Sequence, residues 1–183
     1  MRTFFTALKL FACLTVLTGL LYPLAVTSYA LVVHPEKAKG SLITLMGKPA
    51  GSSLIAQKFT GAQYFHPRPS AVDYNPLPSG GSNASPAGKA LRAAAELRAG
   101  AEWVNTPDMI YASASGLDPH ISPAAANAQC ERVALARGAA KVDIMSLIDA
   151  ATEPRQFGIL GEPRVNVLPL NLELDRKYPY ERK

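Results

Sequence analysis

The residue types that could support nucleophilic catalysis come together at Ser115, Asp118 and His120. In an acyl-transfer triad the histidine takes the serine proton, and the aspartate orients the histidine. This serine lies in Ser113-Ala114-Ser115-Gly116, which lacks the G-x-S-x-G turn of the α/β-hydrolases. Nearness along the chain does not place three side chains together in space. A membrane-tethered or secreted serine hydrolase is therefore kept only as the alternative interpretation.

Two further patterns concern phosphate binding. Gly88-Lys89 contains the GK pair of a Walker A loop, but Asn83 stands where that motif needs its first Gly. Ala90 stands where it needs Ser or Thr. The run Ser79-Gly80-Gly81 resembles weakly the signature motif of ABC transporters, in which a Ser and backbone N–H groups bind a γ-phosphate. An ordinary Gly-Gly turn is the simpler interpretation.

Metal and nucleic-acid binding receive little support. His34, His66 and His120 are scattered, without a carboxylate at ligand spacing, so no metal site is expected. The net charge is +5, and without Arg2 and Lys9 the chain has 17 basic and 14 acidic residues, a net of +3. Such a balance without a basic stripe predicts no nucleic-acid partner.

The N-terminal region predicts a membrane helix. The 24 residues from Leu10 to Val33 contain no charged residue and no histidine. A helix of this length extends roughly 36 Å, enough to cross a hydrocarbon core of about 30 Å. The competing interpretation is a cleaved secretory signal, because Ser28-Tyr29-Ala30 has the small-x-small pattern of a cleavage site. The apolar run continues past that site, which favours a retained anchor.

The flanking charges predict the orientation. Arg2 and Lys9 precede the span, and basic residues remain preferentially on the cytoplasmic side. We therefore expect residues 1–9 in the cytoplasm, residues 10–33 as a single-pass helix in the plasma (inner) membrane, and residues 34–183 as one soluble domain outside the cytoplasm. Small and hydroxylated residues predict that the span packs against a partner helix as well as lipid: Thr15, Thr18, Gly19 and Tyr22.

The soluble part is expected to be one compact α+β domain with a small sheet and about three helices. Ser-Pro pairs, which supply an N-cap and a favourable first residue, start two of the helices. The predicted helices are Ser85 to about Trp103, Ser122 to Arg137 with Gly138 as C-cap, and Val142–Thr152. The predicted strands are Ser41–Leu45, Met109–Ala112 and Val165–Leu174, with Leu54–Phe59 as a short strand or helical turn.

Two segments carry more specific expectations. Gly47-Lys48-Pro49 is expected to turn, and residues 64–86, rich in Pro, Gly, Ser and Asn, are expected to form a long ordered loop. In Val165–Leu174 the alternating leucines indicate a strand, and Pro169 favours an edge position. Glu173 is expected on the solvent side of that strand.

Short blocks of sequence, in a fixed order, span nearly the whole chain: Tyr22–Leu24, Gly40–Ile43, Gly51-Ser52, Leu54–Phe59, Tyr64–His66, Arg68–Ala71, Tyr74–Pro76, Ser79–Asn83, Ala112–Asp118, Ile121–Ala126, Gln129 with Arg132–Ala134, and Gly161–Asp175. Together these blocks resemble the C subunit of the bacterial potassium-transporting ATPase, the Kdp complex. Residues 84–108 match only as a helix.

The resemblance implies a non-catalytic accessory subunit of an ATP-driven potassium uptake pump. Its expected partners are a channel-like potassium-binding subunit, a P-type ATPase subunit and membrane lipid. It would need no cofactor of its own, because the complex handles ATP and K⁺. The family's soluble domain lies on the outer side, over the ion entrance, where ATP is not available. Stabilising assembly and assisting ion access are therefore favoured over nucleotide binding.

The resemblance also implies roles for particular residues. If the chain bound a nucleotide, the candidates would be Ser79, Gly80, Gly81 and Gln129. The candidates for interface or structural loops are Arg68, Tyr74, Asn83, Asp118 and His120.

Overall fold

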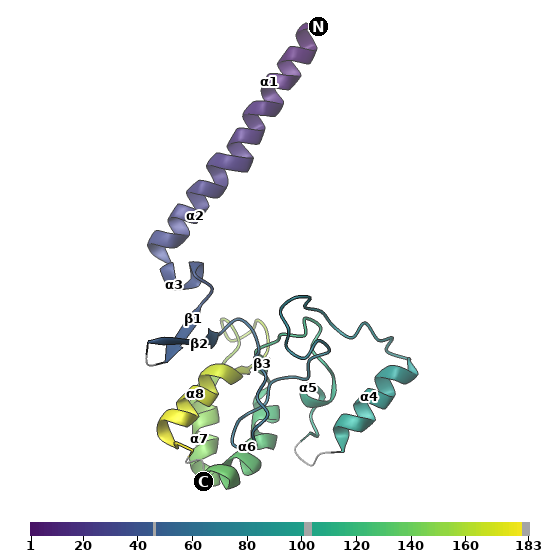
Figure 1. The fold of residues 1–183 in the computed structure, drawn as a ribbon, viewed down its shortest axis with the longest axis vertical. Helices are drawn as coiled ribbons and strands as arrows, with labels where there is room; N and C mark the ends of the chain where they lie inside the picture. Colours follow the sequence, from purple (N-terminus) through teal and green to yellow (C-terminus); the bar gives the residue numbers. More distant parts are fainter. Residues whose placement is uncertain (46, 101–103, 181–183) are drawn as a thin grey trace. The chain divides into compact units, whose positions relative to one another are not determined.

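The computed structural model describes residues 1–45, 47–100 and 104–180. The chain divides into two compact units, Met1–Ser52 and Ser53–Lys183, whose elements are labelled in Figure 1.

The first unit begins with a continuous helix over Arg2–Val33. It consists of α1 (Arg2–Val16), a π-helical turn η1 (Leu17–Leu21) and α2 (Tyr22–Val33). The π-helical turn ends two residues before Pro23, the second residue of α2, whose missing N–H removes one regular helical hydrogen bond. Among the described residues this is the one helix long and apolar enough to cross a membrane.

A short helix and a hairpin complete the first unit. Helix α3 (Pro35–Ala38) leads to the antiparallel strands β1 (Leu42–Leu45) and β2 (Lys48–Ser52). The predicted strand at Ser41–Leu45 is confirmed apart from its first residue. The turn expected at Gly47-Lys48-Pro49 is wrong in part, because Lys48 and Pro49 pair with β1. A two-stranded hairpin has only edge strands, and edge strands tolerate proline.

The second unit packs helices around a small antiparallel sheet with the strand order β3 (His120–Ile121), β5 (Arg164–Asn166), β4 (Thr152–Glu153). Helices α6 (Pro123–Arg137), α7 (Lys141–Ala151) and α8 (Val167–Lys177) lie together beside these strands (Figure 1). Fully buried side chains at their junction include Phe65, Cys130, Val133, Ile144, Ile148, Val165, Leu170 and Leu174. The expected α+β class is confirmed.

Two predicted helices are confirmed, and for α6 the predicted capping is confirmed as well. The Ser122 hydroxyl accepts a hydrogen bond from the backbone N–H of Ala125 at 3.1 Å, as an N-cap does. Gly138 ends α6 with φ +63°, the left-handed conformation that glycine adopts without steric cost. Helix α7 follows at nearly the predicted residues.

The segments before α6 depart from expectation. Helix α4 (Lys89–Ala99) has Gly88 as its N-cap, whereas Ser85 only closes a turn through Gly88 N–H to Ser85 C=O at 2.8 Å. The predicted helix end at Trp103 lies outside the described residues. The strand expected at Met109–Ala112 is wrong, because Pro107 starts the short helix α5 (Pro107–Ile110). Beyond a turn at Ser53-Leu54, the stretch through Phe59 is irregular.

The strand expected at Val165–Leu174 is wrong after its second residue. Strand β5 ends at Asn166, and α8 begins at Val167. Asn166 caps this helix by accepting a hydrogen bond from Leu168 N–H at 3.3 Å, and Pro169 falls in the first turn, where no N–H is needed. The same segment also has an apolar helix face. The buried residues Val167, Leu170, Asn171 and Leu174 are spaced three, one and three residues apart, which places them on one side of a helix. Five helices are therefore described in this unit, where about three were expected.

Candidate functional site

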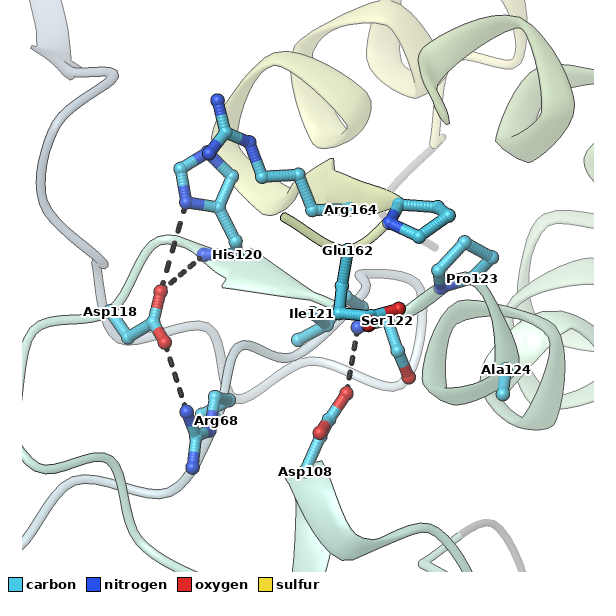
Figure 2. A pocket seen from close by; sticks show the side chains of 11 residues that line it. Arg68, Asp108, Asp118, His120, Ile121, Ser122, Pro123, Ala124, Glu162 and Arg164 are labelled. Carbon is cyan, nitrogen blue, oxygen red and sulfur yellow. Dashed lines mark hydrogen bonds and ion pairs between the residues drawn. The ribbon is translucent and has the colours of Figure 1, made fainter. Parts of the chain in front are cut away.

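Three of the predicted loop residues meet at one cavity. Arg68, Asp118 and His120 line a cavity of about 390 Å³, together with residues of α5, β5 and the start of α6 (Figure 2). They come from three places in the sequence: the long loop, the loop before β3, and β3 itself. Asp108 of α5 also points into this region and accepts a hydrogen bond from Ser122 N–H at 2.7 Å, which fixes the start of α6.

Asp118 is the centre of the network. One carboxylate oxygen accepts from Arg68 Nη1 at 3.0 Å, and the other accepts from His120 N–H at 3.0 Å. The His120 ring nitrogen Nδ1 lies 3.7 Å from the same carboxylate. Burial by itself would raise the pKa of Asp118, but the hydrogen bonds from His120 and Arg68 outweigh it and lower the pKa to about 2. Asp118 therefore stays ionised, and its carboxylate joins Arg68 of the long loop to His120 of β3.

Replacing Asp118 with Asn should reduce the pH dependence of stability. Because folding depresses this pKa from 3.8 to about 2, the carboxylate stabilises the fold above about pH 4 and loses that contribution as the pH falls toward 2. We expect the variant to lose about 1 to 2 kcal/mol at pH 7. Denaturant unfolding of the full chain in detergent, followed at several pH values, measures this. Asp149→Asn, at an exposed position of α7, is the matched control; an equal loss there would contradict the account.

Tyr74 supports the same network through the backbone. Its hydroxyl donates to Arg68 C=O at 3.0 Å, and its own N–H is held by Ser70 Oγ at 2.9 Å. Burial, aided by the nearby Asp73 carboxylate, raises the pKa of Tyr74 to about 12, so the phenol remains a donor. The residue has φ +61°, a strained conformation for a tyrosine that these two hydrogen bonds maintain. Asn83, also at positive φ, is exposed and lies away from this cavity's lining.

Gly81 of the run Ser79-Gly80-Gly81 serves close backbone packing, whereas a Cβ at Gly80 would meet no atom within 4 Å. A Cβ at Gly81 would stand 2.7 Å from Ala114 C=O, and one at Gly116 would stand 2.6 Å from Gly80 C=O. Gly116 also has φ +72°. The two loops can therefore approach each other only because side chains are missing on both.

Gln129, the fourth candidate for nucleotide binding, makes none of its contacts with Ser79, Gly80 or Gly81. Its side chain is fully buried, and its amide exchanges hydrogen bonds with the backbone of His66: His66 N–H to Oε1 at 2.8 Å, and Nε2 to His66 C=O at 3.1 Å. Neither the cavity of Figure 2 nor a second one of about 210 Å³ beside Tyr74 is lined by any of these four residues.

Asn171 makes the same pair of hydrogen bonds with the backbone of Phe65, the residue before His66. This role of Asn171 is not predicted from the sequence. Phe65 N–H donates to its Oδ1 at 2.8 Å, and its Nδ2 donates to Phe65 C=O at 2.9 Å. We call Gln129 and Asn171 the amide clamp, because together they satisfy the backbone of Phe65 and His66. The signal for both residues is an amide side chain on the apolar face of a helix, where an unpaired polar group would be costly.

Guanidinium groups extend the clamp. Arg132 Nη1 donates to Ala62 C=O at 2.6 Å, and Arg137 Nε donates to Gln63 C=O at 2.9 Å. The Arg137 side chain is completely buried and also pairs with Asp175 at 2.7 Å. Residues 62–66, at the start of the long loop, are thus fastened to α6 and α8 mainly through their backbone.

The three residues of the hydrolase interpretation do not form a triad. Asp118 and His120 are paired, but Ser115 Oγ accepts from Leu117 N–H at 3.1 Å and lies 3.5 Å from Ser113 Oγ. Among the hydrogen bonds of the described residues, none joins Ser115 to His120. Within the same residues, no group of three or more His, Cys, Asp or Glu is placed to hold a metal ion.

The predicted packing positions of the N-terminal helix are exposed. Thr18 Oγ1 donates a hydrogen bond to Leu14 C=O at 2.7 Å, so its hydroxyl group already has a partner within the helix. A Cβ at Gly19 would meet no atom within 4 Å, and Tyr22 is largely exposed. Thr15 lies in the same exposed stretch. These positions are available to a neighbouring helix.

Comparison with known proteins identifies the family. The sequence matches the family of K⁺-transporting ATPase c chains, KdpC, over residues 4–176. This chain belongs to the KdpC family. It is 52% identical to the potassium-transporting ATPase KdpC subunit of Rhodospirillum rubrum, with 98% of each chain covered. The KdpC subunit of Geobacter sulfurreducens is 51% identical, with 94% of this chain and 97% of the relative covered. That of Myxococcus xanthus is 50% identical, with 96% and 89% covered.

Proposed function

We propose that this chain is a non-catalytic accessory subunit of an ATP-driven potassium uptake pump. The observation that carries the proposal is the KdpC match over residues 4–176, which includes both the N-terminal helix and the second unit. The curated relatives are named as subunits of a potassium-transporting ATPase. The partners we propose are the channel-like potassium-binding subunit and the P-type ATPase subunit of one complex.

The proposed membrane arrangement is a single pass in the plasma membrane. Residues 1–9 would lie in the cytoplasm, the apolar helix would cross the bilayer, and the second unit would lie outside. Arg2 and Lys9 before the apolar run support this orientation. Outside the cytoplasm there is no ATP, so nucleotide hydrolysis would belong to another subunit.

The proposed contribution of the second unit is assembly. Its network of Arg68, Asp118 and His120, and the amide clamp behind it, use their polar groups to fix loops. Fixed loops favour binding, because less conformational entropy is lost when a partner docks. A nucleotide site using Ser79, Gly80, Gly81 and Gln129 is less well supported, because the Gln129 amide is buried and already hydrogen-bonded. Assistance to ion access remains a further proposal.

The helix contact gives a direct test through Gly19→Leu. Because a side chain at Gly19 would meet open space in the chain itself, the substitution should leave its fold intact. In the complex, the added bulk should prevent close approach of a neighbouring helix. We expect at least about tenfold less of the channel-like subunit to copurify in mild detergent, equivalent to about 1.4 kcal/mol.

The matched control is Leu21→Phe, which enlarges a side chain two residues along, roughly on the opposite side of the helix. It should leave copurification near the wild-type level. Unchanged recovery of the Gly19→Leu chain would contradict close helix packing at this position.

A further inference from the structure

The beginning of α1 carries a basic face. Arg2 and Lys9 are seven residues apart, and seven residues fall only about 20° short of two full helical turns. Both residues are exposed, and they lie on one side of the helix. Phe4 and Phe11, each two residues further along, lie on the opposite side and are 67% and 70% exposed. The N-terminal segment is therefore amphipathic, with cations on one side and aromatic rings on the other.

The two cations have no acidic partner in the described part of the chain. No Asp or Glu precedes Glu36 in the sequence. Every ion pair among the described residues lies in the second unit, at or beyond Lys58. Arg2 and Lys9 can therefore bind an anionic group that another molecule supplies.

The length of the helix places this basic face among lipid headgroups. The helix Arg2–Val33 has 32 residues and extends roughly 48 Å, whereas the hydrocarbon core of a bilayer is about 30 Å thick. Because the uncharged residues 10–33 occupy the core, residues 2–9 lie in the headgroup layer. Helical side chains lean toward the N-terminus, so the Lys9 side chain extends away from the core toward the level of Arg2. Both cations thus lie at the depth of the lipid phosphates.

The basic face is also the side of the helix that a partner helix would leave to lipid. Thr18, which is expected to pack against a partner, lies nine residues beyond Lys9, or about two and a half helical turns. A neighbouring helix on the side of Phe11 and Thr18 would therefore leave Arg2 and Lys9 facing the bilayer. Two cations at the membrane surface attract an anionic headgroup. A zwitterionic headgroup is a poorer match, because it carries its own cation beside the phosphate.

We infer that Arg2 and Lys9 form a binding site for the headgroup of one anionic phospholipid. The Arg2 guanidinium and the Lys9 ammonium group both donate hydrogen bonds to its phosphate oxygens. The inference goes beyond the proposed function. It requires the apolar helix to be retained in the membrane, and it depends neither on the proposed partner subunits nor on the proposed orientation.

Native mass spectrometry of the full chain in mild detergent tests the site. The chain, tagged at its C-terminus, is titrated with phosphatidylglycerol and separately with phosphatidylcholine, and we expect it to prefer phosphatidylglycerol. Arg2→Gln with Lys9→Gln should weaken phosphatidylglycerol binding about thirtyfold, because each basic residue near an anionic lipid contributes about fivefold. Lys89→Gln with Arg92→Gln is the matched control, because it removes the same charge from exposed positions of α4. The control should bind phosphatidylglycerol as the wild-type chain does.

A charge-preserving variant separates a shared helix face from general electrostatic attraction. Ala7→Lys with Lys9→Ala keeps the net charge and moves the ammonium group to roughly the opposite side of the helix. We expect this variant to bind phosphatidylglycerol about fivefold more weakly than the wild-type chain. Wild-type affinity in this variant, or in the double glutamine variant, would overturn the inference. Equal binding of both lipids by the wild-type chain would overturn it as well.

Copurification from native membranes separates this inference from the proposed function. If the double glutamine variant loses other subunits but still binds phosphatidylglycerol normally, Arg2 and Lys9 pair with carboxylates of a partner, and the lipid site is wrong. A wild-type chain that prefers phosphatidylglycerol but copurifies with no other subunit would support the lipid site and contradict the proposed function.

Discussion

Asn171→Ala should destabilise the second unit by about 3 to 5 kcal/mol, because it leaves a buried N–H and a buried C=O without partners. Both groups belong to Phe65, which is fully buried, and Asn171 itself is 1% exposed. The measurement is denaturant unfolding of the full chain in detergent, followed by the circular dichroism signal that is lost as the helices of this unit unfold.

Asn127→Ala is the matched control for this prediction. Asn127 lies on the exposed face of α6, and its replacement should change the free energy of unfolding by no more than about 0.5 kcal/mol. If Asn171→Ala were equally mild, the amide clamp would not be a principal support of the loop. Gln129→Ala should resemble Asn171→Ala, because Gln129 binds the next backbone unit in the same manner.

Arg137→Lys should cost about 3 kcal/mol although it conserves the charge. The buried guanidinium donates to Gln63 C=O, to Tyr178 C=O at 2.8 Å and to Asp175, and it lies 5.0 Å from the centre of the Tyr64 ring. The lysine ammonium group is compact, so it cannot reach all three acceptors that surround the wider, planar guanidinium group of Arg137. At least one partly buried backbone carbonyl would lose its partner.

The midpoint of thermal unfolding measures the effect of Arg137→Lys. Arg176→Lys is the control, because Arg176 is exposed and pairs with Glu173 on the surface of α8. The control should unfold at the wild-type temperature. Equal unfolding midpoints for both variants would show that the buried guanidinium group of Arg137 contributes no more to stability than a surface ion pair does.

Local signals predict α6 and α7 well, because their ends depend on neighbouring residues. Ser122-Pro123 caps the start of α6, and Gly138 supplies its left-handed end. The same reasoning fails at α8, where the leucines fit a strand period and a helix face equally well. Tertiary packing decides that case: β5 needs only three residues to pair with β3 and β4. The remaining residues pack against α7 as a helix and bury Val167, Leu170 and Leu174.

The site is predictable only in part for a related reason. Family resemblance names Arg68, Tyr74, Asp118 and His120, and the structure brings them together in one network. Asn171 is missed because its partner is the backbone of Phe65, 106 residues away in the sequence. No local sequence pattern predicts which backbone groups will lie beside a buried side-chain amide in the folded chain. An amide on an apolar helix face is the only warning that such a partner is required.

Copurification of the wild-type chain tests the central claim most directly. The tagged chain is extracted from its native membrane in mild detergent, and everything bound to it is identified by mass spectrometry. A channel-like polytopic protein and a P-type ATPase subunit, recovered with the intact N-terminal helix, are the predicted result. A chain recovered alone, or one cleaved after Ala30, would contradict an accessory subunit anchored in the pump.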